Sequence, residues 1–95
     1  MRSHVSDIVL SLSGRDKGRL LLVLREEEQY LYLADGRGRR AESPKRKKRR
    51  HTAYQGRCDE WTRNRLEQNG RLTNNELRRA LARFQQASTE GHDPI

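Results

Sequence analysis

The chain has 95 residues, of which 32% are hydrophobic and 36% charged, with a formal net charge of +8. A chain of this size and composition can bury one small core, which excludes several independently folded domains. No apolar run approaches the ~20 residues of a membrane span, no signal core follows Met1, and the single Cys58 has no disulfide partner, so we expect a cytoplasmic protein without a membrane contact.

The first half of the chain has the pattern of short β-strands joined by turns. Residues 8–12 alternate with the period of two that is typical of a half-buried strand. Residues 19–25 form a second apolar run, which as a strand would place its even-numbered leucines on one face and its odd-numbered residues on the other. Between them, residues 13–18 predict a turn in which Gly18 adopts a backbone conformation that a side chain would forbid.

Three more strands are expected before the middle of the chain. Residues 30–33 alternate again, which predicts that their leucines face the core and their tyrosines the outside. The Asp-Gly pair at positions 35 and 36 is a strong turn signal. Residues 39–42 are predicted as a short fourth strand that ends before Pro44, and residues 49–54 as a closing strand. Five short strands with tight turns predict a small, mainly β barrel.

The second half has the pattern of two helices. Residues 60–68 fit a short helix that Asn69-Gly70 would end. Thr73 and Glu76 form a capping box, in which each side chain satisfies a backbone N–H of the other residue. The helix that follows would bury one face, made of Leu77, Ala80, Leu81 and Phe84.

The chain therefore divides into a predicted barrel over residues 1–54 and a helical extension over residues 55–95. Residues 87–95 are expected to fray. The pattern leaves open whether the extension packs on the barrel or binds a partner.

A catalytic function is not expected from the residues available. The three histidines are scattered, Cys58 has no CxxC partner, and no phosphate loop or dinucleotide fingerprint occurs. We therefore expect neither an enzyme nor a metal or other cofactor.

The positive charge is concentrated in the first half. Residues 1–54 hold 14 basic and 7 acidic residues, whereas residues 55–95 hold 7 and 6. Between residues 37 and 50, nine of fourteen side chains are Lys or Arg. Such a local surplus is typical of a protein that binds a polyanion. The alternative, a solvated and disordered basic segment, is less favoured because the run lies between two predicted strands.

Single side chains allow more than one interpretation. Arg15 and Lys17 suit phosphate contacts, whereas Asp16 is expected to orient a neighbouring arginine or the turn. The tyrosines of residues 30–33 would stack on unpaired bases or, as we favour, cover the sheet. His51 would contact phosphate or serve the backbone of a turn.

These motifs resemble a known family. Gly14-Arg-Asp-Lys-Gly18, Asp35-Gly36, Pro44-Lys-Arg-Lys-Lys48 and His51 occur in the order and spacing of bacterial KOW-domain RNA-binding proteins, small relatives of archaeal and eukaryotic large-subunit ribosomal proteins. The resemblance covers about residues 8–52. It implies an SH3-like (KOW) barrel whose glycine loop contacts ribosomal RNA. The chain departs from the family at Thr52, where an apolar residue usually follows the histidine.

By this resemblance Gly14, Arg15, Lys17 and Gly18 are loop positions, and Arg37, Arg40, Lys45, Lys47 and Lys48 form a basic face. Charge and resemblance together predict a non-catalytic, ribosome-associated RNA-binding protein. The predicted RNA-binding residues are Arg15, Lys17, Gly18, Arg19, Arg37, Arg39, Arg40, Lys45, Arg46, Lys47, Lys48, Arg49, Arg50 and His51. Two alternatives remain, a module whose helices dock onto a ribosomal or transcription-elongation protein, and a DNA-binding accessory factor.

Overall fold

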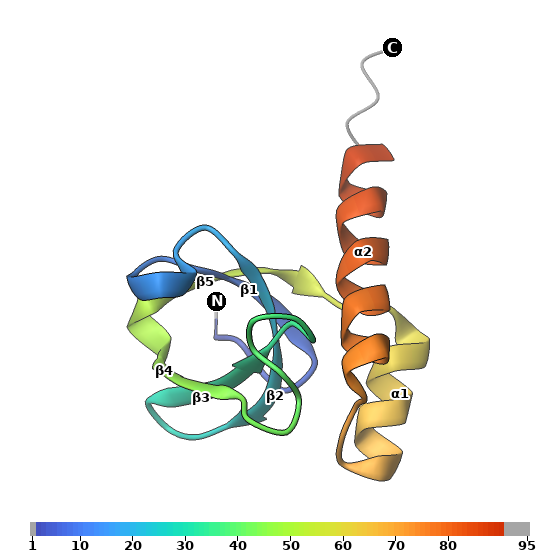
Figure 1. Cartoon of the computed structure of the whole chain (residues 1–95), viewed down its shortest axis with the longest axis horizontal. Helices are drawn as coiled ribbons and strands as arrows, with labels where there is room; N and C mark the ends of the chain where they lie inside the picture. Colours follow the sequence, from blue (N-terminus) through green and yellow to red (C-terminus); the bar gives the residue numbers. More distant parts are fainter. Residues whose placement is uncertain (1, 91–95) are drawn as a thin grey trace.

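A computed structural model describes residues 2–90 and contains a single antiparallel sheet with two helices against it (Figure 1). The elements are β1 (Asp7–Ser11), the 3-10 turn η1 (Gly14–Asp16), β2 (Leu20–Glu26), β3 (Tyr30–Ala34), β4 (Lys45–Lys48), the 3-10 turn η2 (Arg49–His51), β5 (Thr52–Arg57), α1 (Glu60–Asn69) and α2 (Asn74–Glu90). The strand order is β4-β3-β2-β1-β5. The sheet curves strongly but is not closed, because β4 and β5 lie at its two ends.

Strand alternation divides the apolar residues between two cores, so the expectation that a chain of this composition buries one small core is wrong. The first core lies between the sheet and the helices, and the second lies on the opposite face of the sheet. The predicted facing is confirmed: Leu22 belongs to the first core, whereas Leu21 and Val23 belong to the second. Leu31 and Leu33 are also fully buried in the second core. Each such side chain contributes about 1.5–3 kcal/mol of burial free energy.

The helical extension packs on the sheet. Leu77, Ala80 and Leu81 of α2 are buried in the same cluster as Ile8 and Leu22 of the sheet. The predicted facing of α2 is therefore confirmed. Within residues 2–90, neither helix has the length and apolar character to cross a membrane.

The predicted helix ends are also confirmed. The Thr73 hydroxyl accepts a hydrogen bond from the Glu76 N–H at 3.1 Å, and the Glu76 carboxylate accepts one from the Thr73 N–H at 2.9 Å. Gly70, in the left-handed region at φ 76°, ends α1. α2 continues to Glu90, four residues into the segment that is expected to fray. The remaining five positions lie outside the described residues.

Two strand predictions are wrong. Residues 39–42 belong to the loop between β3 and β4, because side chains rather than a strand partner satisfy its backbone: Asp35 accepts hydrogen bonds from the N–H groups of Arg37 and Arg39, and Asn74 accepts one from Ala41. The fourth strand is instead the basic run itself, Lys45–Lys48. Residues 49–51 form η2, so the last strand begins at Thr52 and continues to Arg57.

Two glycines with positive φ allow a matched test of the contact between this loop and α2. Gly36 has φ +80° and a Cβ there would collide with the backbone oxygen of Asn74, whereas Gly70 has φ +76° and no atom within 4 Å of its Cβ position. We expect Gly70→Ala to lower the free energy of unfolding by about 1–2 kcal/mol, for the left-handed conformation alone. Gly36→Ala should lose about 1–3 kcal/mol more, for overpacking. Denaturant unfolding measures both losses, and equal values would contradict the loop–helix contact.

Candidate nucleic-acid interface

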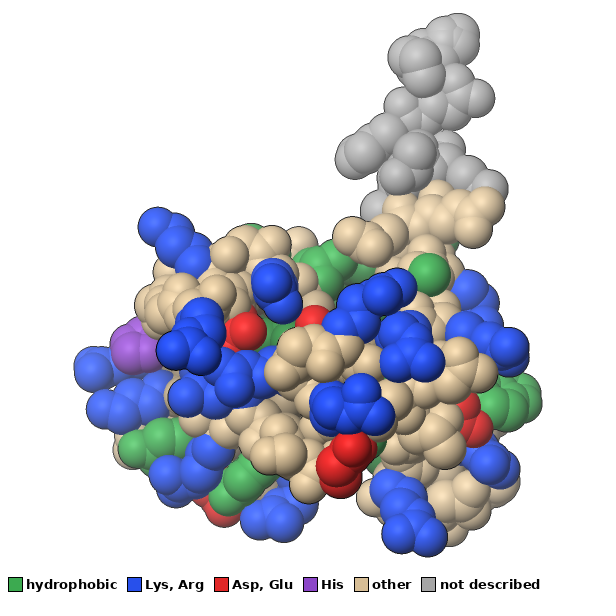
Figure 2. Space-filling view, in the orientation of Figure 1, with side chains coloured by type: hydrophobic (Ala, Val, Ile, Leu, Met, Phe, Trp, Pro, Cys, Tyr) green, Lys and Arg blue, Asp and Glu red, His purple; other side chains and the backbone are tan. Residues whose placement is uncertain are grey.

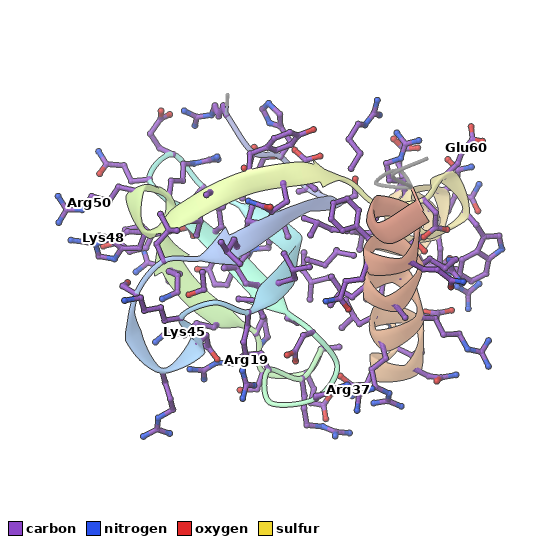
Figure 3. The ribbon with its side chains drawn as sticks, turned by 90° about the horizontal axis from the view of Figure 1, so that it is seen from above. Arg19, Arg37, Lys45, Lys48, Arg50 and Glu60 are labelled. Carbon is purple, nitrogen blue, oxygen red and sulfur yellow. The ribbon has the colours of Figure 1, made fainter. Side chains whose placement is uncertain are left out.

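Seven Lys and Arg side chains gather along one edge of the molecule and make no hydrogen bond or ion pair with any other residue in the range 2–90. We call this set the cationic edge; its members are Arg15, Lys17, Arg19, Arg37, Lys45, Lys48 and Arg50. In Figure 3 the labelled members run from Arg50 and Lys48 through Lys45 and Arg19 to Arg37, and Glu60 lies at the opposite corner. Six of the seven are exposed and Lys45 is half-buried. Figure 2 shows that acidic side chains are sparse among the Lys and Arg groups on the face it presents.

Strand β4 sends its consecutive cations to different environments. Lys47 lies opposite Leu31 of the second core, so its stem is buried, with 7% of the residue exposed, and its Nζ donates to the Ser13 carbonyl at 3.0 Å. Arg46 and Lys48 point to the other face of the strand. There Arg46 lies over the Tyr30 ring, with Cζ 3.6 Å from its centroid, whereas Lys48 remains exposed. The basic run is therefore an ordered strand with one cation turned inward.

Arg49 is occupied by the protein itself. Its guanidinium donates to the carbonyls of Ser3 at 2.6 Å and Glu27 at 2.7 Å, and to the Glu26 carboxylate at 3.3 Å. These bonds join η2 to the N-terminal segment and to the turn between β2 and β3. Arg49 consequently has a structural role, because its guanidinium N–H groups donate to other residues of the protein.

The two loops that carry most of the cationic edge are tied together by one ion pair. Arg39 Nε donates to Asp16 Oδ2 at 2.8 Å, and only 6% of the Asp16 side chain is exposed. The expectation that Asp16 orients a neighbouring arginine is confirmed. Removal of Arg39 would leave the buried Asp16 carboxylate without its charged partner, which destabilises the fold.

Hydrogen bonds to the exposed Glu42 carboxylate also hold the loop between β3 and β4. Arg40 donates to Glu42 at 2.9 Å, and Asn74 of α2 donates to the other oxygen of the same carboxylate at 2.8 Å. These hydrogen bonds lower the pKa of Glu42 to about 2. The carboxylate therefore stays charged at neutral pH and links the loop to the helix.

The tyrosines of β3 have arginine on their rings. Arg25 Cζ lies 4.3 Å from the centroid of the Tyr32 ring, and Arg46 Cζ lies 3.6 Å from the centroid of the Tyr30 ring. The Tyr32 hydroxyl donates to Glu27 at 3.0 Å, and this bond, with Arg46 and Arg25, lowers the pKa of Glu27. One face of each ring is thus covered inside the protein, which agrees with the favoured interpretation that these tyrosines cover the sheet.

The fourteen predicted RNA-binding residues therefore separate into three groups. Seven form the cationic edge. Gly18 has φ +85° as expected, and His51 is half-buried, with its main-chain carbonyl accepting from the Leu12 N–H at 2.9 Å. The other five have intramolecular partners: Arg39, Arg40, Arg46, Lys47 and Arg49.

Two residues of α2 that support the loop were missed by sequence reasoning. Arg78 donates to the Gly36 carbonyl at 2.6 Å, and Asn74 accepts from the Ala41 N–H at 2.6 Å. Their partners are more than 30 residues away in the chain. A single sequence carries no signal for contacts of this separation.

The thiol of Cys58, the single cysteine of the sequence, is free and buried. Burial, followed by the negative charge of Asp59, raises the pKa of the Cys58 thiol to about 11, so the thiol is protonated at neutral pH and a poor nucleophile. Over residues 2–90 there is no group of three or more His, Cys, Asp or Glu side chains that could hold a metal ion.

Comparison with known proteins adds no family. No family model matches the chain, and no curated protein matches it. The resemblance to KOW-domain proteins therefore stays a prediction, and the function is inferred from charge and geometry.

Proposed function

We propose that this chain is a non-catalytic RNA-binding protein that acts through its cationic edge. The observation that carries the proposal is the cationic edge itself, seven unpartnered Lys and Arg side chains of which Figure 3 labels Arg19, Arg37, Lys45, Lys48 and Arg50. Unpaired cations at this density repel one another, and a polyanion relieves that repulsion. Each phosphate that they neutralise also releases a condensed counterion, which drives association.

Structured RNA, and ribosomal RNA in particular, is the proposed partner. The cations come from two loops, from strand β4 and from the turn η2, so they fit a folded phosphate backbone better than a single groove read by one helix. Hydrogen bonds to Asp16 and Asp35 fix the backbone of the two protein loops. Binding therefore costs less conformational entropy than it would for mobile loops. We propose an association with the ribosome or its assembly in the cytoplasm because the motifs resemble KOW-domain proteins.

The same resemblance supports the proposal that the curved sheet is an SH3-like barrel. The five antiparallel strands, their strong curvature and the 3-10 turn between the last two agree with such a barrel. On this proposal the loop containing η1 and Gly18 is the KOW loop, and the loop from Asp35 to Pro44 lies beside it.

The proposed function predicts how the affinity for nucleic acid depends on salt and on the type of nucleic acid. Titration of a structured ribosomal RNA fragment should give an affinity that falls with salt at a log–log slope of about −3 or steeper, since each contact contributes about −0.7 to −0.9. A DNA duplex of matched length should bind more weakly. A slope near zero, or equal affinity for the DNA, would contradict the proposal.

Substitution of the neighbouring lysines of β4 should have different effects on RNA affinity and on stability. Lys48→Gln should weaken RNA binding and reduce the salt slope by about one contact, while the free energy of unfolding stays within about 0.5 kcal/mol. Lys47→Gln should instead lower the free energy of unfolding by about 1–3 kcal/mol, because the Ser13 carbonyl loses the charged donor of the buried Lys47 and keeps only the Ser11 hydroxyl. Filter binding and denaturant unfolding of both variants measure this contrast. A Lys47→Gln protein with full stability would show that the buried contact is unimportant.

A second candidate function, docking of a ribosomal or transcription-elongation protein on the helices, is favoured by Trp61. This residue is 56% exposed on α1, and it borders a hollow of about 520 Å³ with Thr73 and Arg79. If this candidate holds, protein partners captured from cell extract should survive nuclease digestion and be lost with Trp61→Ala, whereas RNA affinity is unchanged. Partners that disappear on nuclease treatment would exclude protein docking as the main function.

A further inference from the structure

A hollow of about 450 Å³ lies where the cationic edge meets α2. Its walls come from three elements that are distant in the chain: the start of β2, the loop after β3, and one side of α2. The volume is within the range of about 300–1,000 Å³ that is typical of small-molecule sites. The hollow continues a charged surface that we already assign to RNA.

Three arginines surround this hollow. Arg19 and Arg37 belong to the cationic edge, and their guanidinium groups have no partner in the described chain. Arg78 is anchored, since its Nη1 donates to the Gly36 carbonyl at 2.6 Å. Guanidinium groups hold phosphate with paired hydrogen bonds and also stack on nucleobases.

The remaining lining is not that of a simple phosphate site. Leu20, Leu81 and Ala82 add an apolar surface. Asp35 adds a carboxylate that is 8% exposed as a residue, and only its Oδ1 receives hydrogen bonds in residues 2–90. A bare anion would be repelled by Asp35, whereas a nucleobase brings N–H donors to a carboxylate and an apolar face to the leucines.

We propose that this hollow receives one unpaired nucleotide of the bound RNA. Arg19 and Arg37 hold its phosphate, the base lies against Leu20 and Ala82, and Asp35 accepts a hydrogen bond from it. The inference rests on the proposed RNA-binding function and deepens it, because it names an RNA helix with a bulged nucleotide as the preferred substrate class.

The test compares an RNA hairpin carrying a single bulged nucleotide with the same hairpin lacking the bulge. The wild-type chain should bind the bulged hairpin about five- to tenfold more tightly, the lower end of the range for one stacked base. Ala82→Glu should reduce this preference to less than twofold, because the new carboxylate occupies the hollow and pairs with Arg78 four residues earlier.

Ala87→Glu is the matched control. Ala87 is also exposed on α2, has Arg83 four residues earlier, and lines a different hollow. Both variants change the net charge equally, so the ratio of the two affinities within each protein isolates the hollow. Ala87→Glu should keep the wild-type preference, and circular dichroism should show both variants folded.

The possible results separate the two proposals. Salt-dependent binding of both hairpins with no preference for the bulge would overturn the nucleotide site and leave RNA binding intact. A bulge preference that survives Ala82→Glu would place the recognised nucleotide elsewhere and also overturn it. Failure to bind either hairpin better than a DNA duplex would overturn the proposed function itself.

Discussion

The ion pair between Asp16 and Arg39 is the contact on which the geometry of the cationic edge depends. It connects the loop after β1 to the loop after β3, and those loops carry Arg15, Lys17, Arg19 and Arg37. Four like charges on unconnected loops would move apart to lower their mutual repulsion. A buried carboxylate between the loops opposes that movement, and its low exposure reduces screening by solvent and salt. The anion therefore makes the concentration of cations possible.

All seven acidic residues of the first half have positioning roles of this kind. Each one accepts a hydrogen bond from a basic side chain, a tyrosine or a backbone N–H. The residues concerned are Asp7, Asp16, Glu26, Glu27, Glu28, Asp35 and Glu42.

Local patterns in the sequence predicted the parts of the fold that local physics decides. The strand at β1, the facing of β2 and β3, the capping box at Thr73 and the buried face of α2 depend on residues close in the chain, and the structure confirms them. The half-buried alternation expected for β1 is wrong, since Val9 and Ser11 are buried and Leu12 is 45% exposed. β4 was placed wrongly because Lys and Arg carry little strand signal. The inward position of Lys47 depends on Leu31, sixteen positions earlier, and the charge run alone does not reveal it. For the same reason the sequence predicted fourteen RNA-binding residues, of which seven have unpartnered cationic side chains.

The helical extension lies outside the resemblance to KOW proteins, yet it supports the proposed interface. Asn74 and Arg78 hold the loop after β3 through Ala41, Glu42 and the Gly36 carbonyl. Without these bonds the loop would lose its fixed position beside Asp16, and ordering it on RNA would cost conformational entropy at each residue. Since α2 also provides Ala82 and Arg78 to the hollow, the helix both orders the loop and shapes the proposed nucleotide site. The extension therefore belongs to the proposed binding surface, although no local sequence pattern connects the two.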